Sequence, residues 1–103
     1  MISKIQTCVR EGNYRFTSHA IERCIERDIC PAEIKEAINS GEIIESYPHD
    51  KYGPTCLIRG ITKRKRILHI LCSLDSIWII TAYDPTLSPE EWDKNFRIRR
   101  KKT

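Results

Sequence analysis

The sequence has no apolar run that approaches the ~18 consecutive residues needed to cross a bilayer. It also has no apolar stretch directly after Met1, so we expect neither a signal peptide nor a membrane span, and a cytoplasmic location. Its 4 glycines and 5 prolines in 103 residues are typical of a globular protein rather than a disordered or collagen-like chain. The length predicts one domain over residues 1–103.

The five cysteines form no C-x-x-C pair, which argues against a disulfide framework and predicts free thiols that act as small core residues. A zinc site built from His19, Cys24 and Cys30 would have a spacing that matches no common zinc finger or ribbon. The sequence also lacks a P-loop, a dinucleotide fingerprint, a G-x-S-x-G motif and a carboxylate pair. We therefore expect no metal site, no cofactor and no serine chemistry.

The net charge of +4 hides an uneven distribution along the chain. Residues 1–50 carry 6 basic and 9 acidic side chains, whereas residues 51–103 carry 12 basic and 5 acidic ones. The excess lies in two clusters, Lys63, Arg64, Lys65 and Arg66, and then Arg97, Arg99, Arg100, Lys101 and Lys102. Clustered Lys and Arg are typical of surfaces that bind a polyanion or an acidic protein. The alternative is a solvated turn and chain end, where charge costs little.

Apolar residues recur at helical spacing through the first 41 residues. They predict helices over residues 2–11 and 18–28, and a third that begins at Pro31 and ends at Gly41. Thr17 or Ser18 can cap the second helix. Residues 14–17 alternate and can form a short strand.

The hydrophobic period then changes to two. The predicted strands are residues 42–47, 55–62, 67–74 and 77–83, and a helix start follows at Ser88 and Pro89. The predicted fold is therefore α+β, with N-terminal helices packed on a mainly antiparallel four-stranded sheet, then a short C-terminal helix and a basic tail.

The turns between the last three strands predict their register. Two-residue turns fit at Arg64-Lys65 and at Asp75-Ser76. They place Arg59 opposite Ile70, and Leu68 opposite Tyr83.

Strict alternation then determines the two faces of the predicted sheet. Arg59, Thr81 and Tyr83 are expected on one face, and His69 is expected on the other with Trp78 and Ile80. Because His69 lies in an almost continuous apolar strand, we interpret it as a hydrogen-bonded core residue and leave it out of the site.

One polar row on the second predicted helix carries only cationic or titratable groups. His19, Arg23 and Arg27 lie at i, i+4 and i+8, and adjacent like charges repel unless acids or an anion compensate them. Glu22 and Glu26 can do so in a solvated ion-pair network. A bound phosphate is the alternative.

Metal-independent RNA cleavage needs a base for the 2′-hydroxyl, an acid for the leaving oxygen and cations for the phosphorane. Histidine and tyrosine can supply the first two, and the planar fork of arginine suits phosphate. The predicted catalytic residues are His19, Arg23, Arg27, Arg59 and Tyr83, with Thr81 in support. His19 would act as acid or base with Tyr83 as its partner. Their convergence requires the helix to dock over the sheet face that carries Tyr83.

The most specific motif in the chain is S-H-A-x-x-R-x-x-x-R over residues 18–27. It is accompanied by Tyr14 and Phe16, by G-E-I-I-E-x-Y-P over residues 41–48, by Gly60, by I-I-T-A-Y-x-P over residues 79–85, and by Trp92. From about Tyr14 to Arg97 the chain resembles a small prokaryotic family, the domain of unknown function 4258 family. The order of helices before a strand meander is similar to the RelE and BrnT ribonuclease toxins.

This resemblance implies a toxin-like ribonuclease fold. It picks out His19, Arg23, Arg27, Thr81, Tyr83, Trp92 and Arg97. Members are often met beside zinc-finger antitoxins, which implies a cognate antitoxin as partner. Independently of the family, Gly60 in a strand predicts a bulge or a close approach of another segment, and Trp92 is expected to pack the final helix onto the sheet.

The leading hypothesis is a toxin-type, metal-independent endoribonuclease of a toxin–antitoxin system, acting on RNA alone or on the ribosome. The residues expected to bind RNA are Lys63, Arg64, Lys65, Arg66, Arg97, Arg99 and Arg100. The first alternative is a non-catalytic module that uses the same basic surface to bind nucleic acid or an acidic protein. The second is a folded but inert relative of such toxins.

Overall fold

The computed structural model describes residues 2–51 and 53–100. Within these ranges the chain forms three α-helices, a five-stranded sheet and two 3-10 turns. The helices are α1 (Ile2–Arg10), α2 (Ser18–Glu26) and α3 (Pro31–Asn39). The strands are β1 (Arg15–Phe16), β2 (Glu42–Tyr47), β3 (Thr55–Ile61), β4 (Ile67–Ser73) and β5 (Trp78–Tyr83). The predicted strands agree with β2 to β5 within one residue at each end.

The sheet has the order β1-β5-β4-β3-β2, and the predicted count of four strands is wrong. The fifth strand, β1, lies parallel to β5, whereas all other neighbours are antiparallel. Backbone hydrogen bonds from Arg15 N to Ile77 O and from Thr17 N to Ile79 O, each 3.0 Å, hold β1 at the edge. Such a two-residue strand is too short to give a reliable alternating pattern.

Local capping explains where α2 begins and ends. Thr17 Oγ1 accepts a hydrogen bond from the Ala20 amide at 3.0 Å, which confirms the predicted cap. The helix ends at Glu26, two residues before the predicted end, and Asp28 has a left-handed backbone with φ 53°. In the described ranges no helix is long and apolar enough to cross a bilayer.

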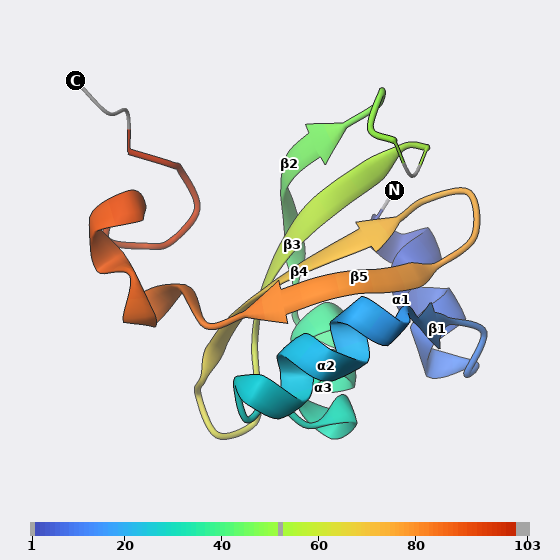
Figure 1. Cartoon of the computed structure of the whole chain (residues 1–103), viewed down its shortest axis with the longest axis horizontal. Coiled ribbons are helices and arrows are strands. Elements are labelled where there is room, and N and C mark those ends of the chain that lie inside the picture. The colour runs from blue at the N-terminus through green and yellow to red at the C-terminus, as the bar shows by residue number, and fades with distance from the viewer. Residues whose placement is uncertain (1, 52, 101–103) are drawn as a thin grey trace.

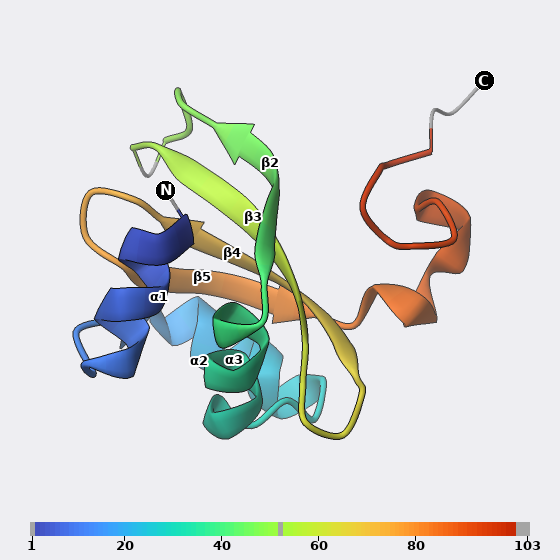
Figure 2. The ribbon, with the colours of Figure 1, turned by 180° about the vertical axis from the view of Figure 1, so that it is seen from behind.

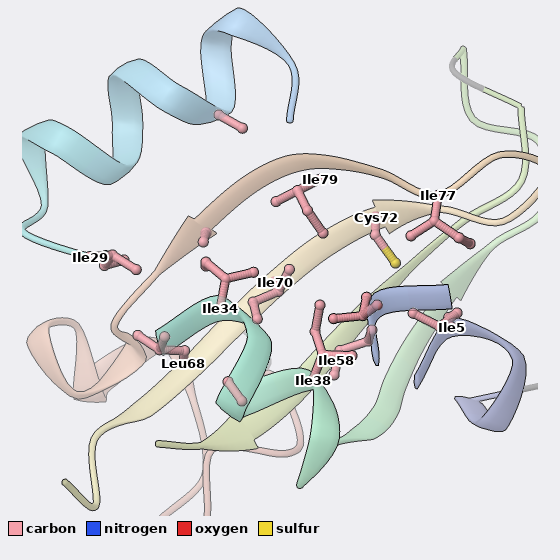
Figure 3. Packing of buried hydrophobic residues seen from close by; sticks show 14 of the residues in the cluster. Ile5, Ile29, Ile34, Ile38, Ile58, Leu68, Ile70, Cys72, Ile77 and Ile79 are labelled. Carbon is pink, nitrogen blue, oxygen red and sulfur yellow. The ribbon is translucent and has the colours of Figure 1, made fainter. Parts of the chain in front are cut away.

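All three helices lie on one side of the sheet, and the last part of the chain lies away from them (Figures 1 and 2). Between helices and sheet the core consists mainly of isoleucine with smaller apolar side chains, and Ile34 and Ile38 of α3 are directed toward Ile58 and Ile70 of the sheet (Figure 3). The face that carries Tyr83 is therefore the one the helices leave uncovered. The docking of α2 over that face, which the predicted site required, does not occur, because the apolar side of α2 packs into the core on the opposite face.

The contact between α3 and β3 depends on Gly60. A Cβ atom at Gly60 would lie 1.8 Å from the carbonyl oxygen of Ala37, so only glycine allows this separation. The prediction of a close approach at Gly60 is confirmed. This contact brings α3 down onto the sheet and fixes the layer on the helix side.

The β3–β4 turn is one residue longer than predicted. Thr62 N donates to Arg66 O at 2.8 Å, and Lys65 has a φ of 70°, as expected of a three-residue hairpin loop closed by a left-handed residue. The longer loop shifts the register by one residue. Arg59 therefore lies opposite His69 and not opposite Ile70.

The β4–β5 pairing follows the predicted register only near its turn. Cys72 pairs with Ile79 as predicted, but the next pair is Leu71 with Thr81, so Ile80 is an extra residue in a β-bulge. Beyond the bulge all pairs are shifted by one residue. The alternation of apolar and polar residues in the sequence does not reveal this bulge, because Ile79 and Ile80 are both apolar.

The two shifts together correct the placement of His69. It pairs with Arg59 on one side and with Tyr83 on the other, where the prediction had Leu68 opposite Tyr83. His69 therefore shares a face with Arg59 and Tyr83, and its predicted position on the opposite face is wrong. Its interpretation as a buried, hydrogen-bonded residue is confirmed.

Residues 84–100 form a C-terminal segment without an α-helix. It contains two 3-10 turns, Pro85–Leu87 and Pro89–Glu91, in place of the predicted helix, and the second turn ends at Trp92, whose backbone is extended. Trp92 follows them and is 2% exposed. It packs this segment onto the sheet, which is the role expected for Trp92. Lys101 and Lys102 of the predicted basic tail lie outside the described residues.

The five cysteines are free thiols. Cys24, Cys56 and Cys72 are buried and pack as core residues, which agrees with the prediction for these three. Cys8 is half-buried and Cys30 is exposed.

Candidate functional site

The uncovered face of the sheet brings three polar side chains into one row. Arg59 of β3, His69 of β4 and Tyr83 of β5 are successive partners across the three central strands. The C-terminal segment lies against this row, because Arg59 Nε donates to Asn95 O at 2.8 Å and His69 contacts Phe96 O. Arg59 and His69 thus lie between the sheet and the C-terminal segment.

A hydrogen-bond chain runs from the C-terminal segment through His69 to Tyr83. His69 Nε2 lies 2.7 Å from the carbonyl oxygen of Phe96, which can only accept, so Nε2 carries the proton. Nδ1 then has a free lone pair and accepts the hydroxyl proton of Tyr83 at 3.2 Å. The backbone carbonyl therefore fixes the tautomer of His69 and, through it, the direction of the Tyr83 hydroxyl.

Burial determines the protonation of this pair. It lowers the pKa of His69, with the nearby charges of Arg59 and Arg99 acting in the same direction and the Phe96 carbonyl opposing them. Burial also raises the pKa of Tyr83 to about 12. At neutral pH we therefore expect a neutral imidazole and a protonated phenol.

Tyr83 lies in an open groove of about 390 Å³, which we call the Tyr83 groove. Its lining comes from the end of α2, the end of β5 and the C-terminal segment: Arg27, Tyr83, Asp84, Leu87, Ser88, Glu91, Trp92 and Arg99. Arg27 and Arg99 belong to different parts of the chain and both reach the groove. Two guanidinium groups beside a phenol are suited to a phosphate group.

Arg99 is positioned by contacts on several sides. Its Nε lies 3.0 Å from Glu45 Oε2, and its guanidinium carbon lies 4.6 Å from the centre of the Trp92 ring. Trp92 in turn packs edge-on against His69, with ring centres 4.3 Å apart. Tyr47 donates its hydroxyl proton to Glu45, and burial raises the pKa of Tyr47. Glu45 thus joins β2 to the C-terminal segment beside the groove.

The structure brings together three of the predicted site residues, Arg27, Thr81 and Tyr83. Arg27 extends from the end of α2 across the edge of β5, where its Nη1 lies 2.8 Å from Ala82 O and 3.4 Å from Thr81 Oγ1. This contact places the Arg27 guanidinium next to Tyr83 although α2 itself lies on the other side of the sheet.

The other two members of the predicted helix row do not reach the groove. His19 is exposed at the first turn of α2, eight positions before Arg27, which corresponds to about 12 Å along the helix axis. Arg23 forms an ion pair with Glu26 at 2.6 Å, which is the solvated pairing that the spacing also allowed. Neither residue lines the Tyr83 groove.

Arg59 lies on the predicted face of the sheet, but its side chain is too deeply buried to contact a substrate. It is 9% exposed, and burial together with Arg97 lowers the pKa of its guanidinium. Because its Nε donates to the Asn95 carbonyl, its observed contact fixes the C-terminal segment on the sheet.

Most arginines of the two basic clusters are engaged within the protein. Arg66 donates to Asp28 O at 2.7 Å and to Arg27 O at 3.0 Å, and it pairs with Glu33 and Asp84. In the tail, Arg97 pairs with Glu42 at 2.6 Å, Arg99 pairs with Glu45, and Arg100 donates to Trp92 O. Lys63, Arg64 and Lys65 are exposed in the β3–β4 loop.

Sequence reasoning left His69 and Glu45 out of the site and gave Trp92 only a packing role. The only local signal for His69 is a titratable group in an otherwise apolar strand, and buried histidines of that kind are common. Trp92 and Glu45 become recognisable only when the C-terminal segment is seen against β2 and β4. Among the residues that the structure describes, no three His, Cys, Asp or Glu side chains are grouped so as to hold a metal ion.

Comparison with known proteins gives one family. The model of the family described as Domain of unknown function (DUF4258) matches residues 16–84, about two thirds of the chain, and the chain therefore belongs to that family. The matched range includes Arg27, His69 and Tyr83 and ends before the segment that supplies Phe96 and Arg99. No curated protein and no solved structure matches the chain.

Proposed function

We propose that this protein is a metal-independent endoribonuclease of the toxin type, which binds an RNA phosphodiester in the Tyr83 groove. The observation that carries the proposal is the hydrogen-bond chain from Phe96 O through His69 to Tyr83, which ends in a groove flanked by Arg27 and Arg99. This arrangement provides a proton acceptor and two cations without a metal ion. It replaces His19 by His69 as the histidine of the site.

In the proposed reaction the ribose 2′-oxygen attacks the neighbouring phosphorus, and the bond from phosphorus to the 5′-oxygen breaks. The 2′-hydroxyl proton passes to Tyr83 Oη while the Tyr83 proton passes to Nδ1 of His69. The imidazolium that results donates to Tyr83 and to the Phe96 carbonyl. The departing 5′-oxygen takes a proton from water, and the hydroxide that remains takes the proton of Tyr83 Oη while His69 Nδ1 returns its proton to Tyr83. The products carry a 2′,3′-cyclic phosphate and a 5′-hydroxyl, and both side chains regain their starting protonation.

The surrounding charges support this role. The lowered pKa of His69 keeps its Nδ1 lone pair available at neutral pH, and Glu45 opposes the lowering by a favourable charge interaction. Arg99 uses its Nε for Glu45, and a guanidinium has five N–H donors, so its other nitrogens can donate to phosphate oxygens. Arg27 approaches from the other wall. Together the two arginines would balance the charge of the phosphorane.

The decisive experiment compares RNA cleavage by wild-type protein, Tyr83→Phe and Tyr14→Phe, with and without ribosomes and in the presence of a chelator. Tyr83→Phe keeps the ring and removes only the hydroxyl, and we expect cleavage to fall by about 100-fold or more. Tyr14→Phe is the matched control, because Tyr14 contacts Phe16 on the helix side of the sheet. Cleavage at the wild-type rate by Tyr83→Phe would refute the assignment.

A second function is favoured by a different observation, the internal pairing of Arg66, Arg97 and Arg99. Because these arginines of the two basic clusters are engaged, binding to a partner would fall to the exposed cluster residues of the β3–β4 loop, Lys63, Arg64 and Lys65. Such a surface suits a non-catalytic module that binds nucleic acid or an acidic protein.

Expression in growing cells separates the two functions. The ribonuclease predicts growth arrest that Tyr83→Phe abolishes and that a cognate antitoxin, in the first instance a zinc-finger protein, relieves. The binding module predicts no dependence on Tyr83, and loss of binding when Lys63, Arg64 and Lys65 are all changed to Glu.

A further inference from the structure

A second hollow adjoins the Tyr83 groove on the uncovered face of the sheet. It has a volume of about 350 Å³, within the range of about 300–1,000 Å³ typical of small-ligand pockets. Leu57 and Leu71 contribute its apolar part, and Tyr47 and Tyr83 contribute aromatic rings. We call it the Leu57–Leu71 hollow. Tyr83 and Arg99 line both cavities, so the two lie next to each other.

The lining of this hollow matches the chemistry of a nucleobase. Bases in single-stranded RNA bind by stacking on aromatic side chains and by hydrogen bonds to their Watson–Crick edges. Tyr47 can supply a ring for stacking, and the two leucines give an apolar surface that excludes water from the base. The phosphate attached to such a nucleotide would lie toward Arg99 and Tyr83, where the two cavities meet.

One carboxylate lines the hollow, that of Asp50. Its Oδ1 accepts from the amide of Lys51 at 2.8 Å and its Oδ2 accepts from Thr55 Oγ1 at 3.1 Å, which fixes the orientation of the group. A carboxylate has about four lone-pair sites, so each oxygen can accept another hydrogen. Guanine is the base whose Watson–Crick edge presents two adjacent donors, N1–H and N2–H₂, to such a pair of oxygens.

We propose that the Leu57–Leu71 hollow is a guanine subsite that places the guanosine 3′-phosphate beside Tyr83. This inference rests on the proposed ribonuclease function. It adds that the enzyme is specific for guanosine and cleaves RNA on its 3′ side. Asp50 is the specificity-determining residue, and Tyr47 is the stacking platform. Asp50, which follows β2, thus contributes to the site.

The test measures binding of a nucleotide that is not cleaved, guanosine 3′-monophosphate, by NMR of the leucine methyl groups. We expect saturable shifts at Leu57 and Leu71, and about tenfold weaker binding of inosine 3′-monophosphate, which lacks the 2-amino group but is otherwise identical. Equal binding of the two, tighter binding of any other nucleoside monophosphate, or no shifts at these methyl groups would overturn the proposal. This comparison needs only wild-type protein.

Variants then assign the preference to individual side chains. Asp50→Asn should abolish the distinction between guanosine and inosine nucleotides, whereas Glu90→Gln removes the same charge from an exposed position outside the hollow and should preserve it. Tyr47→Ala should weaken binding by about tenfold or more, and Tyr47→Phe should retain it, because the ring stacks and the hydroxyl is bonded to Glu45. Retained discrimination in Asp50→Asn would refute its role.

The binding test and the cleavage test fail independently. Selective binding of the guanosine nucleotide without cleavage of any RNA would refute the ribonuclease proposal and support the guanine subsite. Cleavage that depends on Tyr83, without selective nucleotide binding, would refute the guanine subsite and support the ribonuclease proposal. Cleavage products that end in all four bases equally would also contradict the guanine subsite.

Discussion

Replacement of His69 by Gln offers a direct test of the buried hydrogen-bond chain. His69 is fully buried, and burial lowers its pKa below the ordinary 6.5. In the unfolded chain it takes up a proton near pH 6.5, whereas in the folded protein it does so only at lower pH. Between those two values the unfolded state binds more protons, so the stability of the folded protein falls as the pH falls.

The magnitude follows from proton linkage. Within that window one histidine changes the free energy of unfolding by up to about 1.4 kcal/mol per pH unit. His69→Gln removes this titration and also the hydrogen bond to Tyr83, a loss of about 1–3 kcal/mol at neutral pH. The difference in stability between wild type and variant should therefore be largest above pH 6.5 and should shrink on acidification below that value, by no more than about 1.4 kcal/mol per pH unit.

Urea denaturation followed by tryptophan fluorescence measures this difference, since Trp92 packs against His69. Both proteins are compared at several values between about pH 7.5 and about pH 5.5, so that the shared titration of carboxylates cancels. Parallel stability curves for the two proteins in this range, or a difference that grows on acidification, would refute the buried neutral histidine. NMR of the His69 ring nitrogens checks the tautomer, with the proton expected on Nε2.

Two further predictions concern the scaffold of the site. Gly60→Ala should lower the free energy of unfolding by about 3 kcal/mol or more, because the added Cβ would lie 1.8 Å from the Ala37 carbonyl oxygen and α3 must move; thermal denaturation measures it. Arg66→Met should lower the free energy of unfolding by about 2 kcal/mol, because two backbone carbonyls and two carboxylates lose a donor whose side chain is only 25% exposed. Arg64→Met, in the same loop and exposed, is the control and should stay within about 0.5 kcal/mol.

Each scaffold prediction has a clear contrary outcome. A melting temperature for Gly60→Ala equal to that of the wild type would show that α3 does not press on β3 as described. Equal stability of Arg66→Met and Arg64→Met would show that the contacts of Arg66 contribute no more than those of an exposed neighbour.

The sequence predicted secondary structure well wherever the local signal is strong. Thr17 as a cap, Pro31 as a helix start and the four longer strands follow from local hydrogen-bonding and steric preferences that act within a few residues. The short edge strand β1 was not counted in the sheet because two residues give no measurable periodicity.

The site was harder to predict because it depends on register. One extra residue in the Lys63–Lys65 loop and the bulge at Ile80 shift the pairing, and each shift moves a side chain to a different neighbour. His69 therefore joins Tyr83, a contact that the predicted register excluded. Arg27 reaches Tyr83 although α2 lies on the opposite side, since a long arginine side chain extends around the edge of β5.

By itself the sequence determined the α+β class, the order of helices before strands, and a cationic second half of the chain. These properties depend on composition and on hydrophobic periods of 3.6 and 2, which are local. Only the tertiary structure decided that Tyr83, Arg27 and Arg99 meet in one groove with the buried His69 hydrogen-bonded to Tyr83, and that Arg97 and Arg99 are paired with acids of β2. The physical reason is that a bulge, a loop length and the docking of a C-terminal segment are set by packing between elements distant in the chain.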